Sequence, residues 1–224
     1  MTYLQYVHMK QILSDSDRSL LDHQIAQTEK DTGAQIVLAS IIRSDSYAEI
    51  PWKAFAIGAS LAGLVSVILV LFVLGWLTTI LILFSIAVIL ASGALLALLA
   101  ILFPGFARLF LSAERKETET MQYAESLFLS NELFLTEGRR GILILVSQFE
   151  RQVIILPDTG VRDLLSTEVL DKIISTMTGH LRRNDLRQAM EIGLDGIRSA
   201  LGSTKSSRSQ ENEISDEIIE EEGV

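Results

Sequence analysis

The sequence predicts an α/β fold, a single layered domain with a small mixed sheet and flanking helices, interrupted by a two-helix transmembrane hairpin. Two observations predict it. Residues 54–107 contain no Asp, Glu, Lys, Arg or His, and on both sides of them short apolar runs alternate with amphipathic helical patterns. We expect residues 12–51 and 112–202 to form the two parts of the domain, and residues 203–224 to form an acidic tail.

The charge-free stretch is long enough for two membrane spans and a tight turn. A bilayer core about 30 Å thick needs roughly 20 apolar residues of helix. We place the spans at about residues 55–74 and 80–103, around Gly75-Trp76-Leu77-Thr78-Thr79, with Pro104-Gly105 closing the second span. The alternative is a pair of buried helices in a large soluble core. It is disfavoured because such helices normally keep one polar face.

Two spans return the chain to the side that it left, so the two parts of the domain can fold together. Basic residues flank the outer ends of the hairpin, whereas its turn carries no charge: Arg43, Lys53, Arg108, Arg115 and Lys116. The positive-inside rule therefore places both termini and the domain in the cytoplasm. We expect no signal peptide in residues 1–13, which lack an apolar region, and the absence of Cys agrees with a reducing compartment.

Small residues recur four positions apart in both spans, Ala59 with Gly63 and Gly93 with Ala97. Such pairs let helix backbones approach closely in lipid. They fit packing of the two spans on each other or, as the alternative, a homodimer. Neither span contains an ionisable residue, which disfavours a transporter and indicates an anchor.

The first part of the domain is predicted to be a helix followed by a buried strand. Ser14-Asp15-Ser16-Asp17 offers N-cap oxygens, and Thr32-Gly33 ends the helix. Residues 34–42 form a nearly continuous apolar run, typical of a strand buried on both faces. The loop at its carboxyl end is Arg43-Ser44-Asp45-Ser46-Tyr47.

The second part begins with a helix over about residues 113–135. Two apolar runs, at residues 142–147 and 153–156, then predict an antiparallel hairpin. A short helical piece at Val161–Leu165 follows. Two amphipathic helices close the domain, the first capped by Ser166 or Thr167 and the second beginning after Asn184-Asp185.

Charge restricts the partners of the chain. A net charge of -9 argues against a nucleic-acid partner, which would require a basic stripe. Residues 203–224 hold seven acidic residues against two basic ones, with scattered Ile, and this composition predicts a disordered tail. The alternative is a short amphipathic turn that docks on a partner through Ile214, Ile218 and Ile219.

Several segments together resemble the TPM domain family. Asp31–Leu38 is similar to the opening strand of that family, and its second signature is similar to Gly141–Ser147 followed by Glu150–Ile155 and Asp158–Val161. Gly193 and Ile197 fit the closing helix. The resemblance covers about residues 12–51 and 112–202. The chain looks like a member of a bacterial branch with a membrane hairpin inserted at this place, and thus like a protein of the bacterial inner membrane.

The resemblance implies links to phosphatase activity and to calcium binding. Bacterial members often accompany LemA-type membrane proteins, which makes such a protein an expected partner. Many members carry a signal peptide and place a membrane helix after the domain. Here the spans lie inside the domain and the flanking charges predict a cytoplasmic domain, so function does not transfer with the fold alone.

Common catalytic motifs are absent from the sequence. It contains no Gly-rich phosphate loop, no HExxH and no Cys for a zinc site. His8, His23 and His180 lie on the N-terminal segment and on amphipathic helices, without a Gly-x-Ser-x-Gly nucleophile motif. We therefore predict no catalytic constellation and interpret these histidines as surface or interface residues.

The best site candidates are acids in loops at strand ends, where α/β sheets tend to bind ligands. Asp45 follows the first strand, Asp158 follows the third, and Asp163 lies one turn further on. Carboxylates suit Ca²⁺ or another divalent cation, and a bound cation positions a phosphate ester for attack by water. The alternative for Asp158 is a turn and a helix cap. Arg139 and Arg140 either bind an anionic ligand or face lipid head groups.

Two functions are consistent with these observations. The first is a membrane-anchored binding or scaffolding module, and the alternative is a divalent-metal-dependent phosphatase. The phosphatase requires Asp45, Asp158 or Asp163 to converge in a concave pocket. The scaffold predicts that they are dispersed and that the domain exposes an apolar or charged contact surface.

Overall fold

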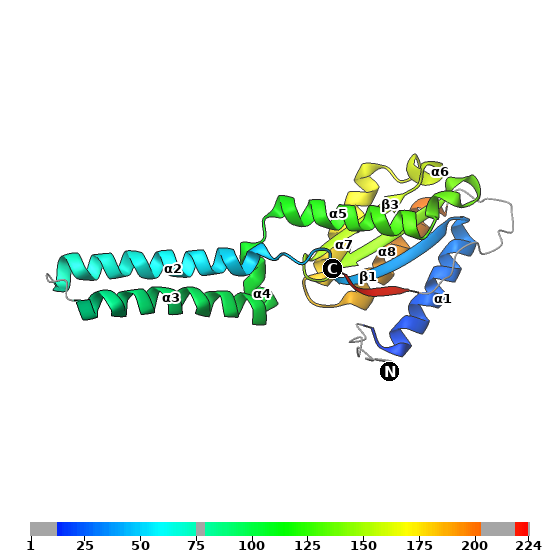
Figure 1. Ribbon diagram of the computed structural model, residues 1–224. Coiled ribbons are helices and arrows are strands. Elements are labelled where there is room, and N and C mark those ends of the chain that lie inside the picture. The colour runs from blue at the N-terminus through cyan, green and yellow to red at the C-terminus, as the bar shows by residue number, and fades with distance from the viewer. Residues whose placement is uncertain (1–12, 75–78, 203–217, 224) are drawn as a thin grey trace, which may run out of the picture. The chain divides into compact units, whose positions relative to one another are not determined.

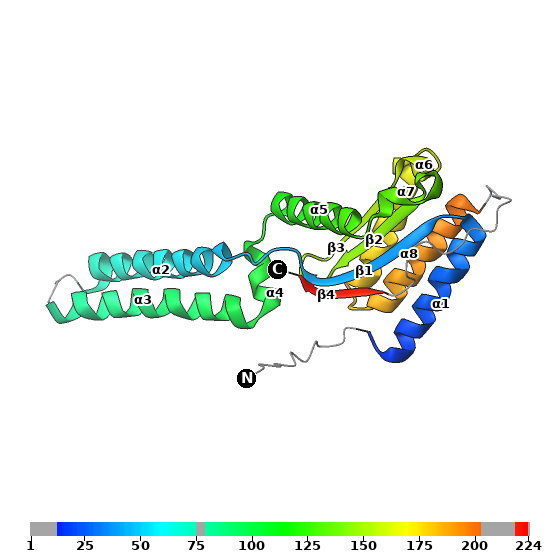
Figure 2. The same cartoon turned by 45° about the vertical axis from the view of Figure 1, so that its right-hand side comes forward.

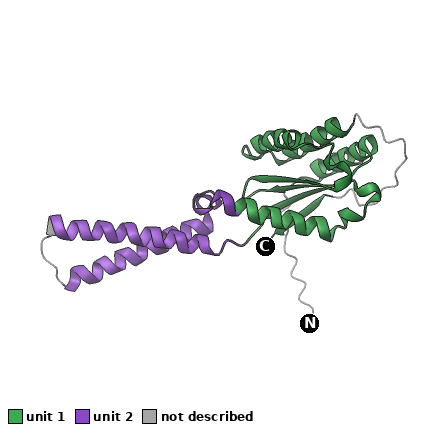
Figure 3. Ribbon diagram, turned by 90° about the horizontal axis from the view of Figure 1, so that it is seen from above, with its two compact units in different colours: residues 1–45, 116–224 green, residues 46–115 purple. Residues whose placement is uncertain are grey.

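The computed structural model describes residues 13–74, 79–202 and 218–223. The chain divides into two compact units, one of residues 1–45 and 116–224 and the other of residues 46–115 (Figure 3). The first unit holds a four-stranded sheet with helices on both faces, which confirms the predicted α/β class. Its sheet combines strands from before and after the inserted hairpin.

The sheet has the strand order β3-β2-β1-β4. Strands β1 (Gln35–Arg43) and β2 (Gly141–Ser147) are parallel, and β3 (Gln152–Pro157) runs antiparallel to β2 as the two apolar runs predicted. Strand β4 (Ile219–Gly223) lies parallel to β1 at the opposite edge (Figure 2). All of β2 and most of β1 are buried, because helices cover both faces of these central strands.

Two hydrophobic cores lie on the two faces of the sheet, because successive strand residues point to opposite sides. Helices α1 (Asp15–Thr32), α7 (Thr167–Leu181) and α8 (Leu186–Leu201) cover one face, and α5 (Ala113–Ser130) covers the other (Figure 1). Fully buried side chains of the first core include Leu21, Ile36, Ile144, Met177 and Ile197. Those of the second include Ala39, Ile41, Ala124, Leu143 and Leu145.

Helix α1 begins and ends where the sequence predicts. The Ser14 hydroxyl accepts a hydrogen bond from the backbone N–H of Asp17 at 3.2 Å, and Gly33 adopts the left-handed conformation with φ 65°. The helix is then fixed to the strand that follows, because Glu29 Oε1 accepts from the backbone N–H of Ile36 at 2.6 Å.

Helix α5 ends earlier than predicted. We expected one helix over residues 113–135, but α5 stops at Ser130, and Glu132 has a φ of 54°. The chain continues as the 3-10 turns η3 (Leu133–Leu135) and η4 (Glu137–Arg139). Leu133 is fully buried in the α5-side core, so burial of this residue outweighs continuation of the helix.

The remaining helices begin at or near the predicted positions. Helix α6 (Thr159–Arg162) begins before the predicted piece at 161–165, because the Asp158 carboxylate accepts from the backbone N–H of Thr159 at 2.7 Å. Helix α7 starts after Ser166, and α8 starts after Asp185, whose carboxylate accepts from the backbone N–H of Gln188 at 3.2 Å. Both starts agree with the predictions.

The prediction of a disordered tail at residues 203–224 was wrong for its end. Residues 203–217 and 224 lie outside the described part of the chain, but Ile219–Gly223 form β4. The composition is unfavourable for a strand, yet the edge of β1 pairs with this segment and offers apolar neighbours, and these tertiary contacts decide the conformation. The predicted amphipathic turn is not observed at Ile218 and Ile219, and Ile214 lies outside the described residues.

The second unit is a helical hairpin. Helix α2 (Glu49–Leu69) continues as η1 (Val70–Leu74), α3 spans Thr79–Leu102, and the short α4 (Pro104–Ala107) and η2 (Arg108–Phe110) follow. Two segments, Glu49–Phe72 and Thr79–Leu102, are each 24 residues long and apolar enough to cross a membrane. The first begins earlier than the predicted residue 55. Of the predicted turn at residues 75–79, Thr79 begins α3, and the other residues lie outside the described part.

The two long helices approach closely at glycines. A Cβ on Gly58 would lie 2.8 Å from the backbone O of Ser92, and one on Gly93 would lie 2.8 Å from the ring of Phe55. Gly93 therefore allows close packing of the two helices of the hairpin, which was one of the two predictions for the small residues. The homodimer stays a prediction.

Candidate functional site

The predicted site acids lie at opposite ends of the sheet. Asp45 follows the carboxyl end of β1, whereas Asp158 follows β3 and donates its backbone N–H to the backbone O of Gly141 at the start of β2. Because β1 and β2 are parallel and β3 is antiparallel to them, the end of β3 lies at the amino ends of its neighbours. The structure therefore does not bring Asp45 and Asp158 together in one pocket.

The carboxylate of Asp158 is occupied by structural contacts. Its side chain is 3% exposed, and the Arg139 guanidinium binds it through two contacts, at 2.9 Å and 2.7 Å. The same carboxylate caps α6. Gly160 is required beside it, because a Cβ there would lie 2.0 Å from the backbone O of Gly138. Asp158 and Arg139 thus fix the β3–α6 turn to the segment that precedes β2.

The other two candidates from this region have separate positions. Asp163 follows α6 and is exposed. Arg140 donates from Nε to the backbone O of Gly33 at 2.9 Å and from its terminal nitrogen to that of Thr32 at 2.8 Å, so it caps the carboxyl end of α1. Among the residues that the structure describes, no group of three or more His, Asp or Glu side chains is arranged to hold a metal ion.

A buried polar cluster lies at the other end of the sheet, which we call the Glu150 cluster: Ser44, Thr120, Ser147 and Glu150. Glu150 is 3% exposed and lies in the turn between β2 and β3. Its carboxylate accepts from the backbone N–H of Ser44 at 2.9 Å, from the Ser44 hydroxyl at 2.8 Å and from the Ser147 hydroxyl. The Thr120 hydroxyl from α5 lies 3.3 Å from that of Ser44.

The Glu150 cluster holds the carboxyl ends of β1 and β2 together. The backbone N–H groups of Gln148 and Phe149 donate to the backbone O atoms of Ile41 and Ile42 at 3.0 and 2.8 Å. Asp45, which is half-buried, directly follows Ser44. This end of the parallel strands is where α/β sheets tend to bind ligands, and it combines one buried carboxylate with three hydroxyl groups. The contacts described for it are hydrogen bonds from hydroxyl and backbone N–H groups to one carboxylate.

The Glu150 cluster was not predicted from the sequence. Glu150 is a polar residue in a hairpin turn, where the usual expectation is exposure to solvent. Glu150 belongs to the cluster through contacts that involve Ser44 and Thr120, which are distant from it in the sequence. A signal existed nevertheless, because Ser147 and Glu150 both lie in the segment that resembles the TPM family.

Strand β4 brings two further acids into contact with the helices. Glu220 pairs with Arg18 of α1 at 2.9 Å, and its side chain is 9% exposed. Glu221 accepts a hydrogen bond from the Tyr123 hydroxyl of α5. Burial of the phenol, and next its hydrogen bond to Glu221, raise the pKa of Tyr123 above its ordinary value, so that it stays a donor.

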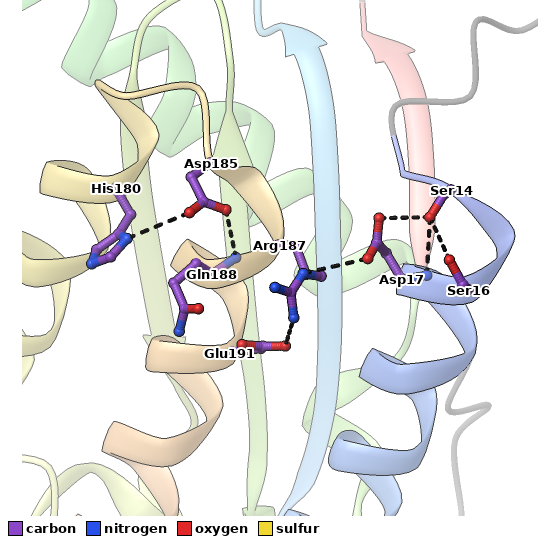
Figure 4. Close-up of polar contacts among 8 residues, drawn as sticks. All are labelled: Ser14, Ser16, Asp17, His180, Asp185, Arg187, Gln188 and Glu191. Carbon is purple, nitrogen blue, oxygen red and sulfur yellow. Dashed lines mark hydrogen bonds and ion pairs between the residues drawn. The ribbon is translucent and has the colours of Figure 1, made fainter.

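The histidines have structural positions where they are described. His180 Nδ1 lies 3.9 Å from Asp185, which caps α8 (Figure 4). Nearby, Arg187 of α8 pairs with Asp17 of α1 at 3.3 Å and with Glu191 of its own helix, and so it ties the two helices together. His23 is exposed on α1, and His8 lies outside the described residues.

A groove of ≈ 590 Å³ lies between α2 and α3 of the hairpin. Its lining is apolar apart from hydroxyl groups, and two of these, on Ser66 and Ser85, donate to backbone O atoms of their own helices at 2.8 Å each. No lining residue is ionisable.

Comparison with known proteins gives a family match for part of the chain and a shared fold. Residues 109–200 match the family model described as the TPM domain. The chain is also similar to the NMR structure of the BA42 protein from the psychrophilic bacterium Bizionia argentinensis, with a TM-score of 0.56 and 12% identity, covering 95% of this chain and 97% of that chain. At this identity the likeness shows a shared fold. No curated protein sequence matches the chain.

Proposed function

Since residues 109–200 of this chain match the TPM domain family, we propose that it acts as a membrane-anchored binding or scaffolding module at the cytoplasmic face of the bacterial inner membrane. One observation carries the proposal. Strand β1 precedes the apolar hairpin and β2 follows it, yet the two strands pair over seven residues. Both parts of the domain must therefore lie on one side of any membrane that α2 and α3 cross.

The chemistry of the hairpin supports an anchor. The two segments that are long and apolar enough to span a bilayer carry exposed apolar side chains over most of their length. Basic residues near its outer ends, Lys53, Arg108 and Arg115, favour the cytoplasmic side for those ends. The dispersal of Asp45, Asp158 and Asp163 supports a binding role over a catalytic one. A LemA-type membrane protein is the partner that the resemblance suggests.

The orientation can be tested with single cysteines, because the natural chain has none. Thr79→Cys places a thiol at the start of α3, beside the turn, and Glu125→Cys places one on the exposed side of α5. A membrane-impermeant maleimide should label Thr79→Cys in spheroplasts and label Glu125→Cys only after permeabilisation. The reverse pattern would overturn the orientation, and extraction of the chain by alkaline carbonate would overturn the anchor.

The alternative, a metal-dependent phosphatase, is favoured by the Glu150 cluster and by the position of Asp45 beside it. Calorimetric titration of Ca²⁺ and then of other divalent cations into the detergent-solubilised chain separates the two functions. For the phosphatase we expect saturable binding that Asp45→Asn removes. Asp158→Asn should retain it, since Asp158 is occupied by Arg139 at the other end of the sheet. Absence of binding would leave the scaffold as the function to pursue.

A further inference from the structure

The edge of the sheet beside β1 is occupied by a short strand from the acidic end of the chain (Figure 2). We propose that this edge is a strand-binding site for an extended acidic segment, that the chain's own residues 218–223 occupy it in cis, and that a partner segment of the same chemistry competes for it. The proposal deepens the binding function above and rests on it, because it names the surface and the partner chemistry.

The four residues from Ile218 to Glu221, at the start of β4, each make a separate contact. Ile218 is 7% exposed in the core formed with α1, α7 and α8, and Ile219 packs against the α5-side core. Glu220 reaches Arg18 on the first face, and Glu221 reaches Tyr123 on the second. This alternation follows from strand geometry. The edge therefore selects two aliphatic residues followed by two acids.

A glycine completes the recognition pattern. Gly223 has a φ of 82°, and a Cβ at this position would lie 1.7 Å from the backbone O of Arg43. Any other residue would have to move the end of the strand away from β1. The preferred ligand is thus an extended segment with the pattern aliphatic–aliphatic–acid–acid–any residue–Gly.

The attachment of β4 is suited to exchange. Glu is depleted in strands, so this five-residue strand depends on its side-chain contacts and on the backbone bonds of β1. The fifteen residues 203–217 separate it from α8, whereas most connections in compact domains contain about 4–6 residues. A strand joined to its own domain has an advantage over a partner segment in solution, which a high-affinity or locally concentrated segment can overcome. Addition of a strand to a sheet edge is an established mode of peptide recognition.

The test uses a fluorescent peptide with the sequence of residues 214–224 and the full chain in detergent. Ile218→Asp with Glu220→Ala in the chain should vacate the edge without shortening the tail and without placing a charge opposite position 18. We expect this vacated chain to bind the peptide at least about tenfold more tightly than the unaltered chain does, by fluorescence anisotropy, because the cis strand no longer competes. Equal affinity of the two chains, or no binding to a vacated chain that keeps its circular dichroism, would overturn the proposal.

A charge exchange makes the test specific. Arg18→Glu in the vacated chain should lower the affinity for the peptide by about fivefold or more. A peptide with Glu220→Arg should recover binding to that chain. A peptide with Gly223→Ala should bind poorly. If Arg18→Glu weakens binding and the peptide with Glu220→Arg does not restore it, the assigned contact between Arg18 and Glu220 is contradicted.

A disulfide provides a second measurement in a chain with an intact tail. Ala39 and Ile219 are partners across β1 and β4 and point to the same face, so Ala39→Cys with Ile219→Cys should form an internal disulfide. Excess peptide should slow formation of the disulfide. A rate that does not depend on the peptide would overturn the proposal that the peptide replaces β4 at this edge. Because neither measurement depends on the membrane, this failure is distinguishable from failure of the anchor, which cysteine labelling reports.

Discussion

Two buried carboxylates of this chain are stabilised in different ways. Asp158 is paired with the Arg139 guanidinium, which supplies an opposite charge, whereas Glu150 accepts hydrogen bonds from hydroxyl and backbone N–H groups. Removing a partner of either one leaves a buried polar group unsatisfied, which costs more than the hydrogen bond contributed. The Glu150 carboxylate is the more consequential because it joins the loop after β1, the end of β2 and the turn before β3.

We predict that Glu150→Gln destabilises the domain by about 1–3 kcal/mol, because an amide cannot accept at both of its terminal atoms. For a domain of this size each kcal/mol lowers Tm by about 2–4 °C, which differential scanning fluorimetry in detergent can measure. Glu125→Gln, at an exposed position of α5, is the matched control and should leave Tm unchanged. Equal effects of the two substitutions would show that the Glu150 cluster contributes little.

At the scale of elements, local patterns predicted the central strands and most helix starts. The branched apolar runs that became β1 and β2 are buried on both faces, and the helices that follow Ser14, Ser166 and Asp185 begin where expected. These features depend on residues close together in the sequence. They could therefore be predicted without knowing the tertiary structure.

Elements that depend on distant contacts could not be predicted. Strand β4 carries three consecutive glutamates and forms only because β1 has a free edge with Arg18 and Tyr123 on its two sides. The positions of Asp45 and Asp158 likewise depend on β1 pairing in parallel with a strand that is far away in the sequence. Antiparallel pairing of β2 and β3 was predictable, but which sheet end each acid occupies was not.

At the scale of the whole molecule, the insertion of the hairpin has a definite geometry. The domain leaves its sheet after β1 and returns at α5, and both points lie in the first unit. They are close together, because the hydroxyls of Ser44 and Thr120 lie 3.3 Å apart and Thr120 also donates to the backbone O of Lys116 at 2.7 Å.

We therefore predict that the domain folds without the hairpin. Replacing residues 46–115 by about six Gly and Ser residues, which span about 13 Å on average, should give a chain that is soluble without detergent. Its circular dichroism should show mixed helix and strand, and its thermal unfolding should be cooperative, because both hydrophobic cores consist of residues outside the deleted segment.

The same shortened chain with Glu150→Gln is the control, since it should unfold at a lower temperature if the Glu150 cluster has formed. A shortened chain that is insoluble or lacks cooperative unfolding would contradict the independence of the two units. It would mean that α2 and α3 stabilise the sheet rather than serve only as its anchor. A soluble, cooperative domain would instead agree with an anchor inserted into a sheet that pairs across it.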